Sequence, residues 1–144
     1  MVVLLRVLIG AIFFASGAGK ILSPYQNFLY VIQGYDFLPE WAAQGAAVFF
    51  PWLELFTGLF LMLGLWCEAS LKSALIMFAA FITVVGQALI RRLPLDNCGC
   101  FGELIHFPLQ AIIVFDSAFF LLSFWLLRNC VRVKALSLDR YFDK

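Results

Sequence analysis

The sequence predicts an all-α integral membrane protein: a bundle of four transmembrane helices with a short interfacial helix after the first span. Two observations predict this fold. Of the 144 residues, 64% are hydrophobic and only 13% are charged, whereas a soluble domain is roughly half apolar and a quarter charged. In addition, most of the chain falls into four apolar runs, each close to the ~20 residues that cross the hydrocarbon core as a helix.

The four runs occupy residues 2–21, 42–66, 71–90 and 108–127. They do not alternate between polar and apolar residues as strands do. In lipid the backbone N–H and C=O groups must form hydrogen bonds within their own segment, which also favours helices. We expect one domain over residues 1–144, whose last part, residues 128–144, is a basic cytoplasmic tail.

A short helix is predicted between the first two runs, with Ser23 as its N-cap and Pro24 as its first residue. Its apolar side chains fall on one face, which is typical of a helix lying in the outer membrane interface: Phe28, Val31, Ile32 and Tyr35.

The basic residues predict the orientation in the membrane. With four spans, both termini lie on one side, and seven of the ten basic residues lie there: Arg6, Lys72, Arg128, Arg132, Lys134, Arg140 and Lys144. The positive-inside rule places this side in the cytoplasm, although Arg91 and Arg92 act in the opposite direction. We therefore expect a protein of the cell (inner) membrane whose segment between the third and fourth runs is periplasmic or otherwise extracytoplasmic.

The net charge of +1 gives no indication of a nucleic-acid partner.

Two cysteines separated by one glycine, Cys98 and Cys100, stand in that outward segment, "LPLDNCGCFGELIHFP". A disulfide between them closes a small, strained ring, and strained, exposed disulfides tend to be catalytic or labile. Such a short loop also removes little chain entropy, so a purely structural disulfide has little to stabilise. Cys67 and Cys130 lie on the cytoplasmic side, beyond the ~7 Å that a disulfide spans, and we interpret them as small apolar residues.

Two other interpretations of the cysteines stay open. One is chance adjacency of two thiols. The other is a metal site made by Cys98, Cys100 and His106 with Asp96 or Glu103, but no second cysteine pair completes the usual four-ligand cage. We favour a redox dithiol and expect no metal.

Two acids fall inside the apolar runs, Glu54 in the second and Asp116 in the fourth. A charged residue at the bilayer centre costs about 2.5–3.5 kcal/mol, so each acid should face the bundle interior and have a partner. Lys20 and Gln87 are the candidate partners. The group Glu54, Gln87 and Asp116 is either a proton path and polar lining for a quinone head group or hydrogen-bonded contact between helices.

Small and polar residues predict how the helices pack. On the third run an inward-facing stripe is expected from Ser73, Ala80, Thr83 and Gln87. Close approach between helices is expected at Gly10, Gly17, Gly58 and Gly64.

The motif "CGCFGE" between the third and fourth runs resembles the MauE branch of the DoxX-like membrane proteins. So do "GAIFFASGAGKILSPYQNFLYVIQGYDFLP" and "FPWLELFTGLFLMLGLW", and the resemblance covers nearly the whole chain. It implies a four-helix protein associated with thiol–disulfide chemistry, since MauE is linked to maturation of the disulfide-rich small subunit of methylamine dehydrogenase beside a thioredoxin-like partner. The architecture is also similar to the vitamin K epoxide reductase type of bundle, which is linked to quinone. Those enzymes use Cys-x-x-Cys and a second outward thiol pair that this chain lacks.

Two functional hypotheses follow. In the first, Cys98 and Cys100 exchange disulfides with a thioredoxin-like or disulfide-containing extracytoplasmic protein, and electrons pass to or from a membrane quinone. In the second, the chain is a non-catalytic accessory subunit that packs against other membrane subunits in a larger respiratory or redox complex.

Overall fold

Five helices make up the part of the chain that the structure, a computed structural model, describes: residues 2–36, 38–91 and 109–129. They are α1 (Val2–Leu22), α2 (Tyr25–Gly34), α3 (Glu40–Leu63), α4 (Cys67–Arg91) and α5 (Leu109–Arg128). Four of them, α1, α3, α4 and α5, are long and apolar enough to cross a membrane, and α2 is the short helix expected after the first span. The predicted all-α membrane fold is confirmed.

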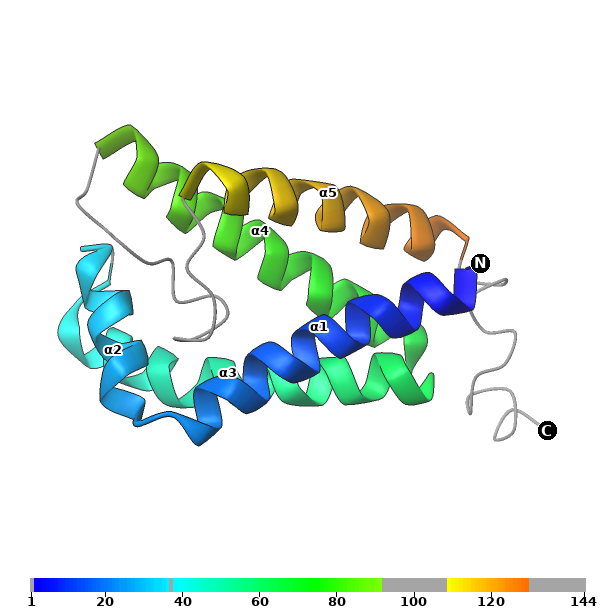
Figure 1. The fold of residues 1–144 in the computed structure, drawn as a ribbon, viewed down its shortest axis with the longest axis horizontal. Coiled ribbons are helices and arrows are strands. Elements are labelled where there is room, and N and C mark those ends of the chain that lie inside the picture. The colour runs from blue at the N-terminus through cyan, green and yellow to red at the C-terminus, as the bar shows by residue number, and fades with distance from the viewer. Residues whose placement is uncertain (1, 37, 92–108, 130–144) are drawn as a thin grey trace.

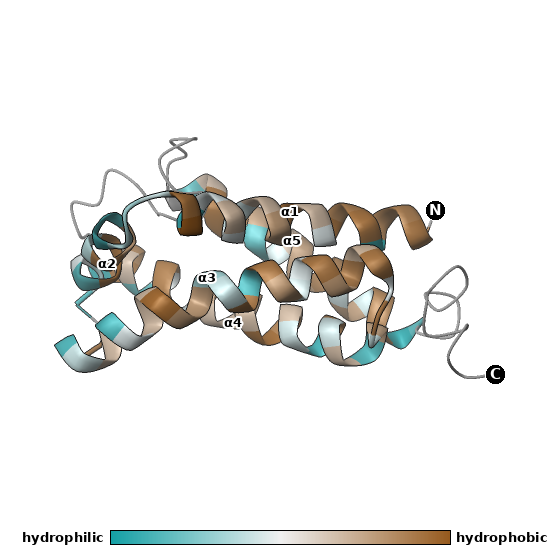
Figure 2. Ribbon diagram, turned by 90° about the horizontal axis from the view of Figure 1, so that it is seen from below, coloured by the Kyte–Doolittle hydropathy of each residue, from teal (hydrophilic) through white to brown (hydrophobic). Residues whose placement is uncertain are grey.

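The four long helices form a closed bundle. α1 packs against α3 and α4 against α5, while contacts of α3 with α4 and of α1 with α5 complete the ring. α2 sits across one end, and α1 begins at the other (Figure 1). Hydrophobic residues run along the long helices, and hydrophilic ones gather on α2 and near the helix ends (Figure 2).

The end of the bundle that carries α2 is also where the segment 92–108 is attached. Arg91, the last residue of α4, donates a hydrogen bond to the Asp36 carbonyl oxygen at 3.5 Å and lies 3.9 Å from the Asp36 carboxylate. The start of α5 faces the same end (Figure 1). Cys98 and Cys100 belong to residues 92–108 and so lie outside the described residues, but both flanking helices bring the chain to this end.

The interior of the bundle is apolar in one half and polar in the other. The half towards the start of α1 contains a hydrophobic cluster of residues from all four long helices: Ile9, Phe13, Leu61, Leu71, Ala74, Met77, Phe78 and Leu126. Rings contact one another across it: Phe13 and Phe78 are tilted with 4.8 Å between centroids, and Phe78 and Phe119 are stacked with 6.1 Å between centroids. The half towards α2 contains the buried side chains of Ser16, Lys20, Glu54 and Asp116.

Both basic residues of the first span lie inside the bundle and not at the membrane surface. Arg6 is 2% exposed and Lys20 is 4% exposed. Arg6 Nη1 donates to Cys67 Sγ at 3.6 Å. Cys67 is buried, as a small apolar residue would be, but its thiol contacts a cation, which the sequence did not indicate.

Helix boundaries differ from the sequence prediction where α3 meets α4. The apolar runs predict spans over residues 42–66 and 71–90, but α3 ends at Leu63 and α4 begins at Cys67. The reason is Gly64, which adopts the left-handed conformation with φ 71° as the C-cap of α3. Gly64 therefore ends a helix, and close packing at this position stays a prediction.

Two polar side chains bond to their own helix instead of taking the predicted roles. Ser23 does not cap α2: its hydroxyl donates to the Gly19 carbonyl at 2.9 Å, and Pro24 occupies the N-cap without a side-chain hydrogen bond. Thr83 does not face inward: it is exposed and donates to the Ala79 carbonyl at 2.8 Å.

The other three predicted glycines do bring helices together, at the contact between α1 and α3. A Cβ atom built on Gly10 would lie 2.8 Å from the Gly58 carbonyl oxygen, and one on Gly17 would lie 2.6 Å from the Leu55 nitrogen. A Cβ atom on Gly58 would collide with the Phe14 nitrogen. Because the atoms in the way are backbone atoms, α1 and α3 can approach this closely only where side chains are absent.

Replacement of Gly58 by alanine is expected to lower the free energy of unfolding by about 1–3 kcal/mol, because α1 and α3 must move apart. Gly45→Ala is the matched control, since Gly45 lies on the same helix and an added Cβ there meets nothing within 4 Å. The free energies are measured by steric trapping in bicelles. Equal effects of the two substitutions would show that the close contact of α1 and α3 does not limit stability.

Candidate functional site

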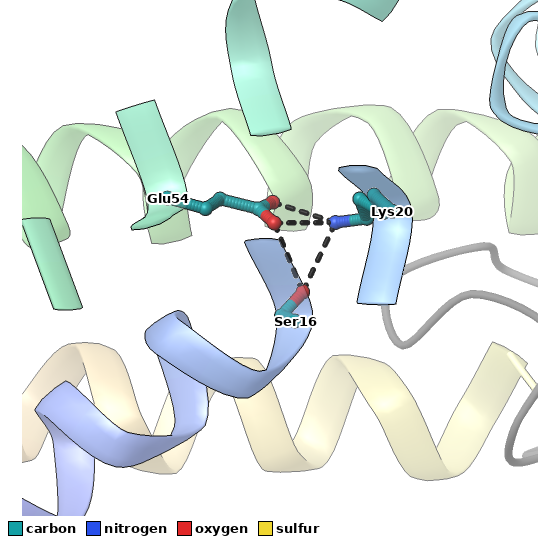
Figure 3. Close-up of polar contacts among 3 residues, drawn as sticks. All are labelled: Ser16, Lys20 and Glu54. Atoms are coloured by element: carbon teal, nitrogen blue, oxygen red, sulfur yellow. Dashed lines mark hydrogen bonds and ion pairs between the residues drawn. The ribbon is translucent and has the colours of Figure 1, made fainter. Parts of the chain in front are cut away.

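A buried ion pair between Lys20 of α1 and Glu54 of α3 is the main polar feature of the described bundle. Lys20 Nζ donates to both carboxylate oxygens of Glu54, at 2.6 and 2.7 Å. Ser16 completes the network: its hydroxyl donates to Glu54 Oε2 at 3.0 Å and accepts a bond from Lys20 Nζ at 3.1 Å. Figure 3 shows the three side chains converging between the two helices. Only 1% of each charged side chain is exposed.

The sequence positions this network through the spacing of residues on α1. Ser16 and Lys20 are one helical turn apart and therefore lie on the same face. Gly17 stands between them and packs directly on the backbone of α3 beside Glu54, where a Cβ atom would lie 2.7 Å from the Pro51 carbonyl oxygen. The glycine contact therefore brings the short serine side chain within reach of the carboxylate.

Aromatic rings from two further helices surround the Lys20 ammonium. The Phe28 ring of α2 has its centroid 4.9 Å from Lys20 Nζ, and the Phe81 ring of α4 has its centroid 5.4 Å away. Both distances fall within the ~6 Å range of cation–π attraction, which is strengthened when the cation is desolvated. α2 therefore contributes to the site itself and does not only lie on the membrane surface.

Asp116 of α5 adds a second carboxylate to this half of the bundle. It is 6% exposed, and within the described residues its Oδ2 atom has no hydrogen-bond partner. It is close enough to interact electrostatically with both Lys20 and Glu54. The site thus combines one ammonium and two carboxyl groups drawn from three helices.

Tyr35, which follows α2, is close to the same site. Its side chain is 6% exposed although it lies outside the four candidate spans. Burial, and in second place the charge of Asp116, raises the pKa of Tyr35 to about 12. The phenol therefore stays protonated at physiological pH.

A family comparison identifies the chain. Residues 1–129 match the family described as methylamine utilisation protein MauE. The chain belongs to the MauE family. The match covers every described helix, including the one that contributes Phe28 to the site. Neither the curated proteins nor the solved structures contain a significant match.

The structure brings together only some of the predicted site residues. Glu54 and Asp116 share the site, and Lys20, not Gln87, is the partner of Glu54. Within residues 2–36, 38–91 and 109–129 the Gln87 side chain makes no hydrogen bond, so a polar lining that includes it remains a prediction. The predicted catalytic residues Cys98 and Cys100, and His106 of the metal alternative, lie outside the described residues.

Sequence reasoning missed Ser16, Phe28, Tyr35 and Phe81. For Ser16 a signal was available, since it lies four residues before Lys20 on the same helical face. The aromatic residues carried no such signal, because 17% of the chain is aromatic and nothing in the sequence distinguishes these rings from the others.

Removing one residue of the buried Lys20–Glu54 pair is expected to lower the free energy of unfolding far more than removing one residue of an exposed ion pair. Lys20→Met leaves a carboxylate without its counterion and should cost about 3–5 kcal/mol of unfolding free energy, while adding Glu54→Leu should restore most of it. Lys72→Met is the control: it breaks the Lys72–Glu68 pair, whose side chains are 58% and 55% exposed, and should cost less than about 1 kcal/mol. If the double variant were as unstable as Lys20→Met, the pair would not account for the loss.

Ionisation of Tyr35 can be followed by absorbance of the tyrosinate in a pH titration. One tyrosine should titrate near pH 12 and disappear from the curve in Tyr35→Phe. Because the Asp116 charge contributes to the shift, Asp116→Asn should move this step to lower pH, though not back to 10, since burial is the larger cause. If Asp116→Asn left the pH of this tyrosine titration unchanged, the charge of Asp116 would not contribute to the pKa of Tyr35.

Proposed function

We propose that this MauE-family chain is a membrane thiol–disulfide redox protein. In this proposal Cys98 and Cys100 take electrons from the dithiol of a thioredoxin-like or disulfide-containing extracytoplasmic protein and pass them to a membrane quinone. The observation that carries the proposal is the buried Lys20–Glu54–Ser16 network, with Asp116 beside it, in the half of the bundle to which the Cys98–Cys100 segment is attached. The family match supports a membrane protein of methylamine utilisation.

The position of the ion pair favours a functional role over simple helix contact. Charged groups within a membrane are costly and mark proton relays and ligand sites. A buried ion pair also contributes little net stability compared with apolar residues of the same volume. If contact between helices were its only role, α1 and α3 would not need it, since they already pack backbone to backbone at Gly17 and Gly58.

The reaction balances without a further reactant. A thiolate of the partner attacks one sulfur of the Cys98–Cys100 disulfide, and the mixed disulfide is resolved by the second thiol of the partner. The partner leaves with its disulfide, and Cys98 and Cys100 are left as two thiols. Their two electrons and two protons then reduce the quinone to the quinol, which restores the disulfide.

The residues of the site fit a quinone head group chemically. A quinone carbonyl accepts hydrogen bonds. Lys20 Nζ could donate to it in place of its bond to Ser16, and the Ser16 hydroxyl could donate to it in place of its bond to Glu54. Phe28 and Phe81 present flat apolar rings beside them. Glu54 and Asp116 are carboxyl groups able to hold a proton close to the same place.

The orientation required is the one that the basic residues predict, with both termini in the cytoplasm. Two described basic residues support it, since Lys72 is exposed near the start of α4 and Arg128 ends α5. Arg6 does not count towards it, because it is buried against Cys67.

Labelling of intact cells with a membrane-impermeant thiol reagent tests this function. Cys98 and Cys100 are expected to react only after mild reduction, and Cys98→Ser or Cys100→Ser should reduce disulfide exchange with the partner to background. Cys67→Ala is the control and should leave exchange unchanged, because Cys67 is buried at the other end of the bundle.

Three other labelling results would each overturn the proposal in a different way. Labelling without reduction would indicate free thiols or a metal site. Absence of labelling in both states would favour the accessory subunit. Labelling only after the membrane is permeabilised would show that Cys98 and Cys100 face the cytoplasm, which is the opposite of the proposed orientation.

A further inference from the structure

A groove lies between α3 and α4, separate from the ion pair. Its volume is about 400 Å³, and its walls include Phe50 and Leu53 of α3 with Ala69, Ser73, Met77 and Ala80 of α4. From Ala69 to Ala80 the groove follows α4 for about 16 Å at the rise of an α-helix. Ile76, 71% exposed, borders it, so the groove is open to the surface that faces lipid.

Phe50 connects the groove to the aromatic side of the Lys20–Glu54 site. Phe50 forms part of the groove wall, and its ring packs against that of Phe81 with 6.2 Å between centroids. Phe81 is also the ring that lies 5.4 Å from Lys20 Nζ. A chain of contacts through Phe50 and Phe81 therefore leads from the groove wall to the Lys20 ammonium.

The groove is apolar apart from two side chains. Lys72 lies at its border near the start of α4 and is paired with Glu68 at 2.7 Å. Ser73 lies in the wall, where its hydroxyl is 3.1 Å from the hydroxyl of Thr57. Thr57 is one helical turn from Glu54 on α3. Polar groups thus continue from the groove wall towards the ion pair.

We propose that this groove binds the isoprenoid tail of the quinone, whose head group is held on the Lys20 side of the Phe50–Phe81 pair. The inference rests on the proposed function and adds where the acceptor binds. An isoprenoid quinone has a polar ring at one end of a long apolar chain, which matches an apolar groove connected through Phe50 and Phe81 to the buried donors. A phospholipid acyl chain fits less well, because its head group must stay at the membrane surface, where Lys72 is already paired with Glu68.

The test compares quinones with and without a tail. Ala80→Leu fills the groove, and Ala79→Leu is the matched control, since Ala79 is the neighbouring residue on the exposed face of the same helix. Binding of ubiquinone and menaquinone, each with its full tail and as the tail-less ring, is measured in nanodiscs by quenching of tryptophan fluorescence. Ala80→Leu should weaken binding of the tailed quinones about tenfold and leave the tail-less rings unaffected, whereas Ala79→Leu should change neither.

The other outcomes overturn the inference in distinguishable ways. An equal loss for tailed and tail-less quinones would mean that Ala80→Leu disturbs the head-group site or the fold. Unchanged binding of both would mean that the tail lies elsewhere, while the proposed function would stand. Loss of a tightly bound phospholipid in native mass spectrometry, with quinone binding intact, would assign the groove to lipid. If the wild-type protein bound neither form, the quinone step of the proposed function would itself fail.

Discussion

The contact between α1 and α3 determines most of what is distinctive in this structure. Gly10, Gly17 and Gly58 remove the side chains that would hold the two backbones apart, and in the bilayer such contact relies on van der Waals packing, because lipid tails give no hydrophobic drive for helices to associate. Ser16 and Lys20 flank Gly17, so the same contact places them against Glu54. Packing and charge pairing are therefore adjacent parts of one contact, in which close packing at Gly17 brings Ser16 and Lys20 within reach of Glu54.

The distribution of polarity follows from this contact. Towards the start of α1 the bundle is filled with aliphatic and aromatic side chains, and phenylalanine rings of α1, α4 and α5 contact one another in turn. Towards α2 the interior contains three ionisable side chains and receives Phe28 from α2 and Phe81 from α4. The polar half is the one to which α2 and the Cys98–Cys100 segment are attached. The proposed quinone would use both kinds of interior, because its head group needs buried hydrogen-bond donors and its isoprenoid tail needs an apolar surface.

The match to the MauE family agrees with the resemblance found in "CGCFGE" and in the first two spans. It also places α2 within the family's length, which accords with the finding that α2 supplies a wall of the polar site through Phe28. Arg6 and Cys67 form a second buried polar contact at the opposite end, next to the apolar cluster. This contact explains why a basic residue is tolerated in the first turns of a membrane helix: it points into the bundle and not towards lipid.

Sequence alone determined the number of spans and their helical structure, because an apolar run of this length crosses the bilayer and its backbone must form its hydrogen bonds within the segment. It also indicated the short helix after the first span and the likeness to the family. It also identified Glu54 and Asp116 as buried acids and Gly10, Gly17 and Gly58 as contact positions. Only the tertiary structure decided that Lys20 and not Gln87 pairs with Glu54, that Gly64 ends a helix, and that Arg6 turns inward. The physical reason is that a periodic pattern gives the face of a residue on its own helix, while a partner depends on the depth and rotation at which two helices meet. Those were set by backbone contacts at glycines, which leave no trace in hydropathy.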